Sequence, residues 1–171
     1  MAARPYRERM PDELPAVTLS NPPERLLRVA NPTMKVLLHT PLVGSLRKQM
    51  MVLTVTGRKS GRRFSFPLTA HQIDGVYYAL TSAPWKNNFR DGARATLQHA
   101  GAIIRVRGEL ITDPGAVADI SRRCAESYGA KRAQMLMGVK FRDKNRIPTV
   151  EEFAEAVARE RFAAIRLTPT G

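Results

Sequence analysis

The sequence predicts an α+β protein in which a mostly antiparallel sheet curls into a small barrel and carries peripheral helices. Three observations predict this class. Short stretches of alternating apolar and polar residues, bounded by glycine, proline or an Asp-Gly pair, recur between residues 50 and 112. Helical periodicity replaces them between residues 115 and 160. A last β-rich stretch at 162–168 returns to the sheet and closes it.

Size and charge narrow the function classes. The chain has 171 residues, which predicts one domain. The 28 Lys and Arg residues outnumber the 15 Asp and Glu residues, so the net charge of +13 predicts an anionic partner. The single cysteine, Cys124, excludes a disulfide framework, and no apolar stretch is long enough to span a membrane. We therefore expect a cytoplasmic protein.

The first half of the chain begins with two segments outside the barrel. Residues 1–23 contain five prolines and are expected to form a flexible, poorly ordered arm. Residues 24–39 predict an amphipathic helix with a basic face, which either packs on its own domain or lies on an anionic membrane. Strands are predicted at 50–56, at 64–69 and, after a turn at Asp74-Gly75, at 76–80. Pro67 places the second strand at an edge or a bulge.

The second half alternates less regularly. Residues 88–99 predict a short helix weakened by Gly92, and residues 103–110 a fourth strand. Helices follow, one with an apolar stripe, one rich in methionine at 133–139, and one that begins at a Thr149–Glu152 capping box. The stripe consists of Val117, Ile120, Cys124 and Tyr128. The prediction is a single domain over 24–171, with barrel core 50–112, helical insertion 115–160 and closing strand 162–168.

The inventory of catalytic side chains is small. Histidine occurs only at positions 39, 71 and 99, without the spacing of metal ligands, so each is expected to be a surface or core histidine. Cys124 lies on an apolar helical stripe and is expected to be a buried small hydrophobe. No nucleophile elbow, phosphate-binding loop or zinc-protease motif occurs. If the protein is an enzyme, a bound cofactor has to supply the chemistry.

Two clusters predict an anion site. Residues 25–73 contain no acidic residue, and within them a turn runs from Gly57 to Gly61 through Arg58, Lys59 and Ser60. Free backbone N–H groups beside cations suit a phosphate or a carboxylate, although an ordinary basic hairpin turn is the alternative. The second cluster, residues 85–90, combines the only tryptophan with a lysine, two asparagines and an arginine. Its alternative is a tryptophan that serves as a packing anchor.

These residues resemble a known family. The run TVTGRKSG, followed after four residues by FPL, then WKNNFRDGARATL, RVRGEL and a final IRLTP, resembles the deazaflavin-dependent nitroreductases over about residues 50–169. The resemblance implies a split β-barrel related to the flavin-mononucleotide-binding, pyridoxamine phosphate oxidase-like proteins. It also implies that coenzyme F-420, an 8-hydroxy-5-deazaflavin, is used for hydride transfer to a quinone, nitro or enone compound.

The resemblance further implies a set of cofactor-binding residues. The turn would bind the cofactor phosphate or its oligoglutamate tail, and one strand would line the deazaflavin through backbone contacts. A second strand end would pass beside the ring or the phosphate, and the tryptophan cluster would close over the phosphate and ribityl chain. Tyr128 is a loose match to a tyrosine over the ring. The turn residues are Arg58, Lys59 and Ser60, and the strand residues are Phe64, Ser65, Phe66, Pro67 and Leu68. The second strand end consists of Ala79, Leu80, Thr81 and Ser82, and the tryptophan cluster of Trp85, Lys86, Asn87 and Asn88.

Two departures and two alternatives remain at the level of sequence. The loop 80–88 is shorter than in nitroreductases that reduce bicyclic drugs, and the segment 115–161 is longer, which leaves the acceptor open. A split barrel that binds flavin mononucleotide or haem is the first alternative. The second is a non-enzymatic module for an anion, an anionic lipid or nucleic acid, and sparse aromatics argue against nucleic acid. We expect a small-molecule acceptor, a monomer or homodimer, and membrane contact, if any, through residues 24–39.

Overall fold

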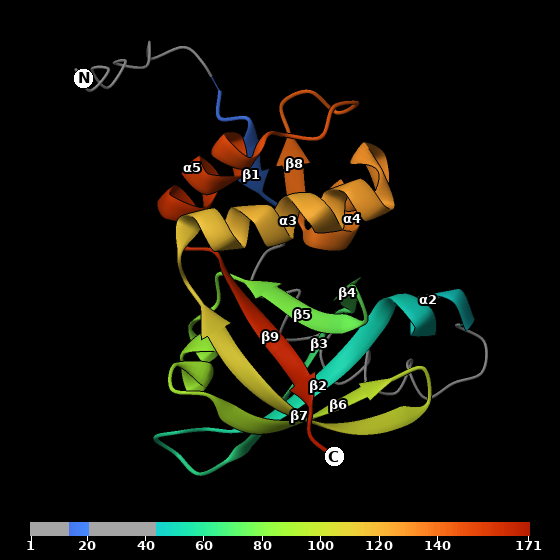
Figure 1. The fold of residues 1–171 in the computed structure, drawn as a ribbon, viewed down its shortest axis with the longest axis vertical. Coiled ribbons are helices and arrows are strands. Elements are labelled where there is room, and N and C mark those ends of the chain that lie inside the picture. The colour runs from blue at the N-terminus through green and yellow to red at the C-terminus, as the bar shows by residue number, and fades with distance from the viewer. Residues whose placement is uncertain (1–13, 21–43) are drawn as a thin grey trace.

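The computed structural model describes residues 14–20 and 44–171, so the amphipathic helix expected at 24–39 lies outside the described residues. Two layers make up the described part (Figure 1). A strongly curled sheet forms one layer, and three helices pack above it as the other. Among the described helices, none is long and apolar enough to cross a membrane.

The main sheet has seven strands, and every neighbouring pair in it is antiparallel. Their order is β3-β2-β6-β7-β9-β5-β4. The two edge strands, β3 and β4, are consecutive in the chain and are separated only by Ala70. One continuous segment therefore belongs to both edges, and the sheet closes on itself. The strands are β2 (Met50–Thr56), β3 (Arg63–Thr69), β4 (His71–Ile73), β5 (Val76–Thr81), β6 (Ala93–His99), β7 (Ala102–Ile111) and β9 (Ala163–Pro169).

This topology confirms the predicted fold class, an α+β split β-barrel with peripheral helices. The last strand, β9, lies between β7 and β5 at the middle of the sheet, as the closing strand at 162–168 predicts. Inward-facing side chains fill the barrel because successive residues of a strand point to opposite faces. Its fully buried members include Leu53, Leu97, Ile165 and Leu167.

The helical layer has its own core. The helices are α3 (Pro114–Tyr128), α4 (Ala130–Met137) and α5 (Val150–Glu160), and a short α2 (Gly44–Gln49) precedes β2. The predicted apolar stripe of α3 is buried at Val117, Ile120 and Cys124. At the start of α5 the predicted capping box is present, since Thr149 accepts from the backbone N–H of Glu152. This layer covers the outer side of β5 and β9 with apolar surface.

One expected element is wrong. Residues 88–99 do not form a helix: a short 3-10 helix, η2 (Pro84–Phe89), ends before Gly92, and strand β6 follows. Gly92 has a φ of 76°, a left-handed conformation that no helix interior accepts. Beyond it, Ala95 and Leu97 are buried while Arg94 is exposed, which is the alternation of a strand.

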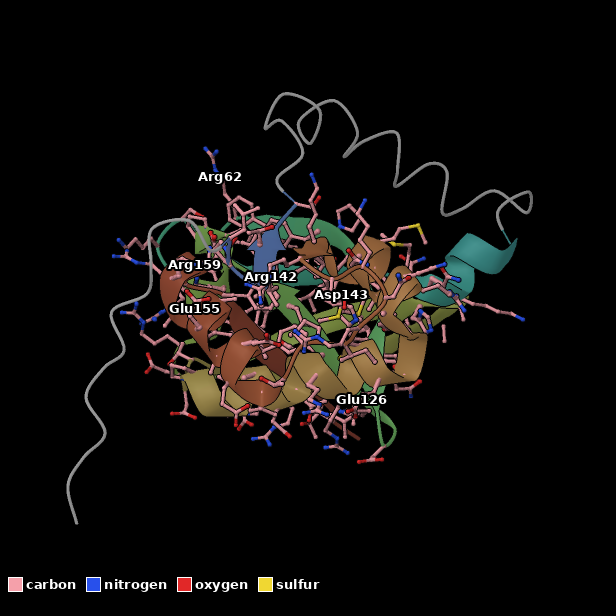
Figure 2. All side chains as sticks on the ribbon, turned by 90° about the horizontal axis from the view of Figure 1, so that it is seen from above. Arg62, Glu126, Arg142, Asp143, Glu155 and Arg159 are labelled. Carbon is pink, nitrogen blue, oxygen red and sulfur yellow. The ribbon has the colours of Figure 1, made fainter. Side chains whose placement is uncertain are left out.

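The N-terminal arm also differs from expectation over residues 14–20. Within them β1 (Val17–Leu19) pairs with β8 (Val139–Phe141) in a separate two-stranded sheet. The prediction of a poorly ordered arm is wrong there, because Val17 is buried in the helical core and its carbonyl accepts from Arg159 of α5. Figure 2 shows Arg159 beside Glu155, its i,i+4 ion-pair partner on the same helix. Within the predicted methionine-rich helical stretch at 133–139, β8 begins after Gly138 ends α4 in a left-handed turn.

Candidate functional site

The glycine-bounded turn forms between β2 and β3, but it does not offer the free backbone N–H groups that the sequence predicts. The N–H groups of Gly57, Arg58, Gly61 and Arg62 all donate to acceptors within the protein. The Gly57 N–H donates to the Arg62 carbonyl at 2.8 Å, and the Gly61 N–H donates to the Gly57 carbonyl at 3.0 Å. Gly61 has a φ of 67°, which favours glycine at the end of the turn. The Ser60 hydroxyl accepts from the Arg62 N–H at 3.3 Å. Arg62 itself points outward into solvent in Figure 2.

Gly57 is required for a different reason. A Cβ at this position would lie 2.7 Å from Phe64 Cε2 and 2.7 Å from Ser60 Oγ. Atoms at that separation overlap, so the Ser60 hydroxyl and the Phe64 ring keep their places only beside a residue without a side chain. The close packing of the turn therefore depends on Gly57.

The two predicted clusters meet at one place. The Arg58 N–H donates to Asn88 Oδ1 at 3.0 Å, and an Arg58 guanidinium N–H donates to the Asn87 carbonyl at 3.4 Å. Asn88 Nδ2 in turn donates to the Trp85 carbonyl at 2.9 Å. The basic turn is thus tied to η2 although the two segments are about thirty residues apart in sequence. The two clusters from which the sequence predicts an anion site are therefore in contact, and together they are called the joint site.

Aromatic side chains form the base of this surface. Phe66 of β3 stacks on Trp85 with 4.4 Å between ring centroids and an interplanar angle of 13°. The ring centroid of Phe64 lies 6.3 Å from that of Phe66, and Phe89 packs edge-on against Trp85 with 6.4 Å between ring centroids. Phe89 is fully buried, and a Cβ on Gly108 would lie 2.3 Å from its ring. The barrel core therefore anchors η2, and η2 fixes Trp85.

The cations of the site differ in how far they are already paired. Arg58 forms an ion pair with Asp91 at 3.1 Å, and both side chains are exposed. Lys86 Nζ donates to the Ser82 and Arg161 carbonyls at 3.2 and 2.6 Å, and burial, then the nearby Arg161 charge, lower its pKa. Lys59 is exposed and has no ion-pair or hydrogen-bond partner within the described residues. Lys59 is accordingly the cation most available to a ligand.

Strand β3 offers an unpaired backbone edge. It pairs only with β2 among the described strands. Hydrogen bonds from Gly57 to Arg62 and from Ala70 to Gln49 frame the ladder. Because paired and unpaired positions alternate in antiparallel sheets, the N–H and C=O groups at 63, 65, 67 and 69 point to the free edge. Pro67, which has no N–H to donate, fits this side, as the predicted edge position requires.

A second hollow adjoins the site on the other side of η2. This groove, of about 680 Å³, is lined by η2, the β7–α3 connection and the end of α5. Lys86, Arg90 and Arg161 outnumber Glu160 in its lining, so the groove is cationic on balance. Arg161 has a left-handed φ of 54° at the end of α5. Arg161 and Asp91 were not among the residues predicted from sequence. Arg161 is remote in sequence, and no local motif marks it.

The structure does not bring every predicted residue to the joint site. Ser65 bonds Thr54, hydroxyl to hydroxyl, at 2.9 Å on the outer side of the sheet. Ala79 is fully buried inside the barrel, and Leu80 packs against the helical core. The Thr81 hydroxyl accepts from the Ala83 N–H at 3.0 Å. Of the segment 79–82, Ser82 alone lines the cationic groove.

Tyr128 lies elsewhere. It ends α3, whose first residue, Pro114, lines the cationic groove with Lys86. A helix of 15 residues is roughly 22 Å long, so Tyr128 is far from η2. Its hydroxyl bonds His71 Nδ1 at 2.9 Å, and burial is the main cause that raises the pKa of Tyr128 to about 12. The structure therefore separates Tyr128 from the predicted cofactor site.

The remaining candidates behave as core residues. Burial lowers the pKa of His71 to about 4 and raises the pKa of Cys124 to about 12. Both groups are neutral at physiological pH, and both are buried. Burial of Cys124 agrees with the sequence prediction, whereas the sequence left open whether His71 is a surface or a core residue. His39 lies outside the described residues. The described residues contain no group of three or more His, Cys, Asp or Glu side chains that could hold a metal ion.

Comparison with known proteins gives structural similarities of low identity. No family model matches the chain, and no curated protein does. A conserved hypothetical protein from Mycobacterium tuberculosis has a TM-score of 0.45 at 12% identity, covering 82% of this chain and 79% of its own. A pyridoxamine 5'-phosphate oxidase-type protein from Listeria innocua has a TM-score of 0.45 at 11% identity, covering 82% and 93%.

An F-420-H2-dependent reductase is also among the similar structures, with a TM-score of 0.41 at 12% identity over 70% of this chain and 94% of that one. Deazaflavin-dependent reductases and pyridoxamine phosphate oxidase-like proteins, the two groups named from the sequence, are thus both represented. The TM-scores of these three structures lie below 0.5, and the similarities support no assignment of function. The side chains of the site have to carry any assignment of function.

Proposed function

We propose that this protein is a deazaflavin-dependent oxidoreductase that transfers a hydride between reduced coenzyme F-420 and a small organic acceptor of the quinone, nitro or enone type. The observation that carries the proposal is the joint site, in which the backbone of Arg58 is bonded to Asn88. It places a basic turn, a tryptophan-bearing 3-10 helix and an unpaired strand edge side by side.

The donors of this site fit the anionic parts of such a cofactor. A phosphodiester and a carboxylate tail need cations and N–H or O–H donors in a concave surface. Lys59 and Ser60 supply an available cation and a hydroxyl, and Gly57 lets the Ser60 hydroxyl and the Phe64 ring keep their places. Arg58 keeps one side of the turn against η2. These residues would hold the phosphate and the start of the tail.

The free edge of β3 fits the heterocycle. A flat ring with alternating donors and acceptors can bond to exposed backbone N–H and C=O groups, which the edge presents at 63, 65, 67 and 69. Trp85 covers the face of Phe66, so Phe66 supports the tryptophan and leaves ring contact to the strand edge. The predicted backbone role of residues 64–68 therefore falls mainly on Ser65 and Pro67.

The protein's own contribution to the reaction is positioning and exclusion of water. When bound, the reduced deazaflavin supplies the hydride. The chain holds the anionic end on the turn, aligns the ring along β3 and covers one side with Trp85. Lys86, Arg90 and Arg161 line the groove beyond η2, where cations stabilise negative charge that develops on an acceptor. No general acid or base among the described residues is needed for these tasks.

Cofactor titration tests the proposal. Coenzyme F-420 and flavin mononucleotide are added separately, and fluorescence quenching gives each Kd. We expect micromolar affinity for F-420 and at least tenfold weaker binding by Lys59→Ala, because loss of a charge-assisted hydrogen bond costs roughly 1.5–3 kcal/mol. Lys131→Ala, an exposed lysine of α4, is the control for loss of one positive charge and should leave the Kd unchanged.

The same titration separates the competing functions. Unaltered F-420 binding by Lys59→Ala would overturn the assignment of the turn. Tight binding of flavin mononucleotide without affinity for F-420 would favour a flavin protein of the same fold. A haem Soret band on reconstitution would favour the haem alternative. Binding to anionic lipid vesicles alone would favour the non-enzymatic module.

A further inference from the structure

We infer that the outer face of the barrel carries a second anion site, built for a small molecule with at least two phosphate groups. A hollow of about 430 Å³ lies on the strands β2, β3, β6 and β7. That volume falls in the range of small-ligand pockets. Its lining includes the side chains of Arg63, Arg94, Arg105, Thr54, Thr56 and Thr96.

The strand registers place these side chains on one face. Thr56 is opposite Arg63, Thr54 is opposite Thr96, and Thr96 is opposite Arg105, and directly opposite residues share a face. Val55 and Ala95, which alternate with them along β2 and β6, are buried in the barrel. The polar set therefore points outward, away from the core.

This face is distinct from the joint site. On β3, Phe66 is opposite Leu53, a core residue, and stacks on Trp85. Arg63, an odd number of residues away, points to the opposite side of the sheet. A ligand in the outer hollow is thus separated from Trp85 by the sheet itself, and the inference does not depend on the proposed cofactor.

The three arginines are exposed and have no ion-pair or hydrogen-bond partner from their guanidinium groups among residues 14–20 and 44–171. No Asp or Glu side chain lines the hollow, but Gly171, which carries the terminal carboxylate of this sequence, lines it together with Thr170. Like charges gathered on a sheet face repel one another, so an anion that bridges them is stabilised by all three. The hydroxyls of Thr56 and Thr96 can donate hydrogen bonds to further oxygens, whereas the Thr54 hydroxyl is already bonded to Ser65.

The spacing of the three arginines indicates what kind of ligand the hollow fits. Arg63, Arg94 and Arg105 are carried by β3, β6 and β7, which span three strand intervals, or roughly 14 Å. A ligand with two or more phosphates can contact arginines on different strands at once, and its larger negative charge is stabilised by more of them. Guanidinium groups bind phosphate oxygens in pairs, and phosphate offers more acceptors than a carboxylate. A phosphorylated organic molecule of nucleotide size fits best.

Calorimetric titration with inorganic diphosphate, and with citrate as a carboxylate comparator, tests this site. We expect diphosphate to bind with a Kd below 1 mM, at least tenfold tighter than citrate. Arg94→Gln with Arg105→Gln should weaken it at least tenfold. Lys131→Gln with Arg132→Gln removes the same charge from α4 and should change the Kd less than twofold. Equal losses in both double variants, or no binding below 1 mM, would show a solvated basic surface and overturn the inference.

Amide chemical shifts locate the bound diphosphate independently of affinity. Shifts centred on Thr54, Thr96 and Arg105 support the outer site. Shifts centred on residues 58–60 and 85–88 would place the ion in the joint site and overturn the inference, without bearing on F-420 binding. Citrate that binds as tightly as diphosphate would overturn the phosphate assignment.

Discussion

At the scale of single residues, the joint site depends on the close packing of Ser60 and Phe64 around Gly57. Gly57→Ala introduces a Cβ 2.7 Å from Phe64 Cε2 and Ser60 Oγ. Both neighbours are ends of side chains at the surface, so they can move, at a cost of about 1 kcal/mol in the free energy of unfolding. We expect F-420 binding to weaken more than tenfold, because Ser60 is displaced. Denaturant unfolding and cofactor titration measure the two effects.

Gly44→Ala is the matched control for that substitution, since a Cβ there meets nothing within 4 Å. It should leave both the stability and the cofactor affinity unchanged. A Gly57→Ala protein that binds F-420 normally would show that the position of Ser60 does not matter for binding.

His71 gives a residue-level prediction about pH. Burial lowers the pKa of the folded His71 to about 4, below the unfolded value of 6.5. Between these two values the unfolded chain binds more protons, so the free energy of unfolding falls as the pH drops from 6.5 to 4. The full difference is roughly 3 kcal/mol. Denaturant unfolding at several pH values should show this slope, and His71→Gln should remove most of it, whereas His99→Gln should not.

At the scale of elements, the capping box of α5 makes a separable contribution. Thr149→Ala removes the hydroxyl that accepts from the Glu152 N–H at 3.2 Å, and the expected loss is about 1 kcal/mol of unfolding free energy. Thr149→Ser keeps an acceptor and should restore most of it. A thermal melt of the three proteins measures the effect, and an unstable Thr149→Ser protein would assign the loss to the methyl group.

Elements with a clear period were predictable from the sequence, and the others were not. Strands β2, β3, β5, β7 and β9 and helices α3 and α5 follow their apolar patterns and their turn or capping residues. The helix predicted at 88–99 is wrong because the local residue preferences favour a helix, whereas pairing of β6 with β2 and β7 determines the conformation of this segment. Strands β1 and β8 are three residues each, too short to show a period.

The residues of the candidate site also differ in how well the sequence predicts them, depending on whether they carry a local sequence signal. Residues 57–61 and 85–88 carry local signals, namely paired glycines, clustered cations and a lone tryptophan, and the structure joins them. Tyr128 and Ala79 were assigned to the site only by resemblance to the family. In the structure, Tyr128 packs against the helical core and Ala79 lies in the barrel core. Arg161 and Asp91 reach the site through tertiary contacts that no local pattern records.

At the scale of the whole molecule, the order of strands predicts where the fold is most stable. Strand β9 is paired on both sides and its Ile165 and Leu167 are fully buried. We expect their amides to exchange with solvent only through global unfolding. The amides of Ser65 and Thr69 face the free edge of β3 and should exchange orders of magnitude faster. Hydrogen exchange followed by NMR checks this, and protection at Ser65 in the free protein would show that another segment covers the edge.

The position of β9 also bears on how the chain acquires its fold during synthesis. The strand made last lies between β7 and β5, so the earlier strands cannot complete their pairing while it is still inside the ribosome. Non-local pairing of this kind slows folding and leaves strand edges open to other chains in the meantime. The nascent protein therefore exposes two unmatched half-sheets until β9 has emerged and paired with β7 and β5.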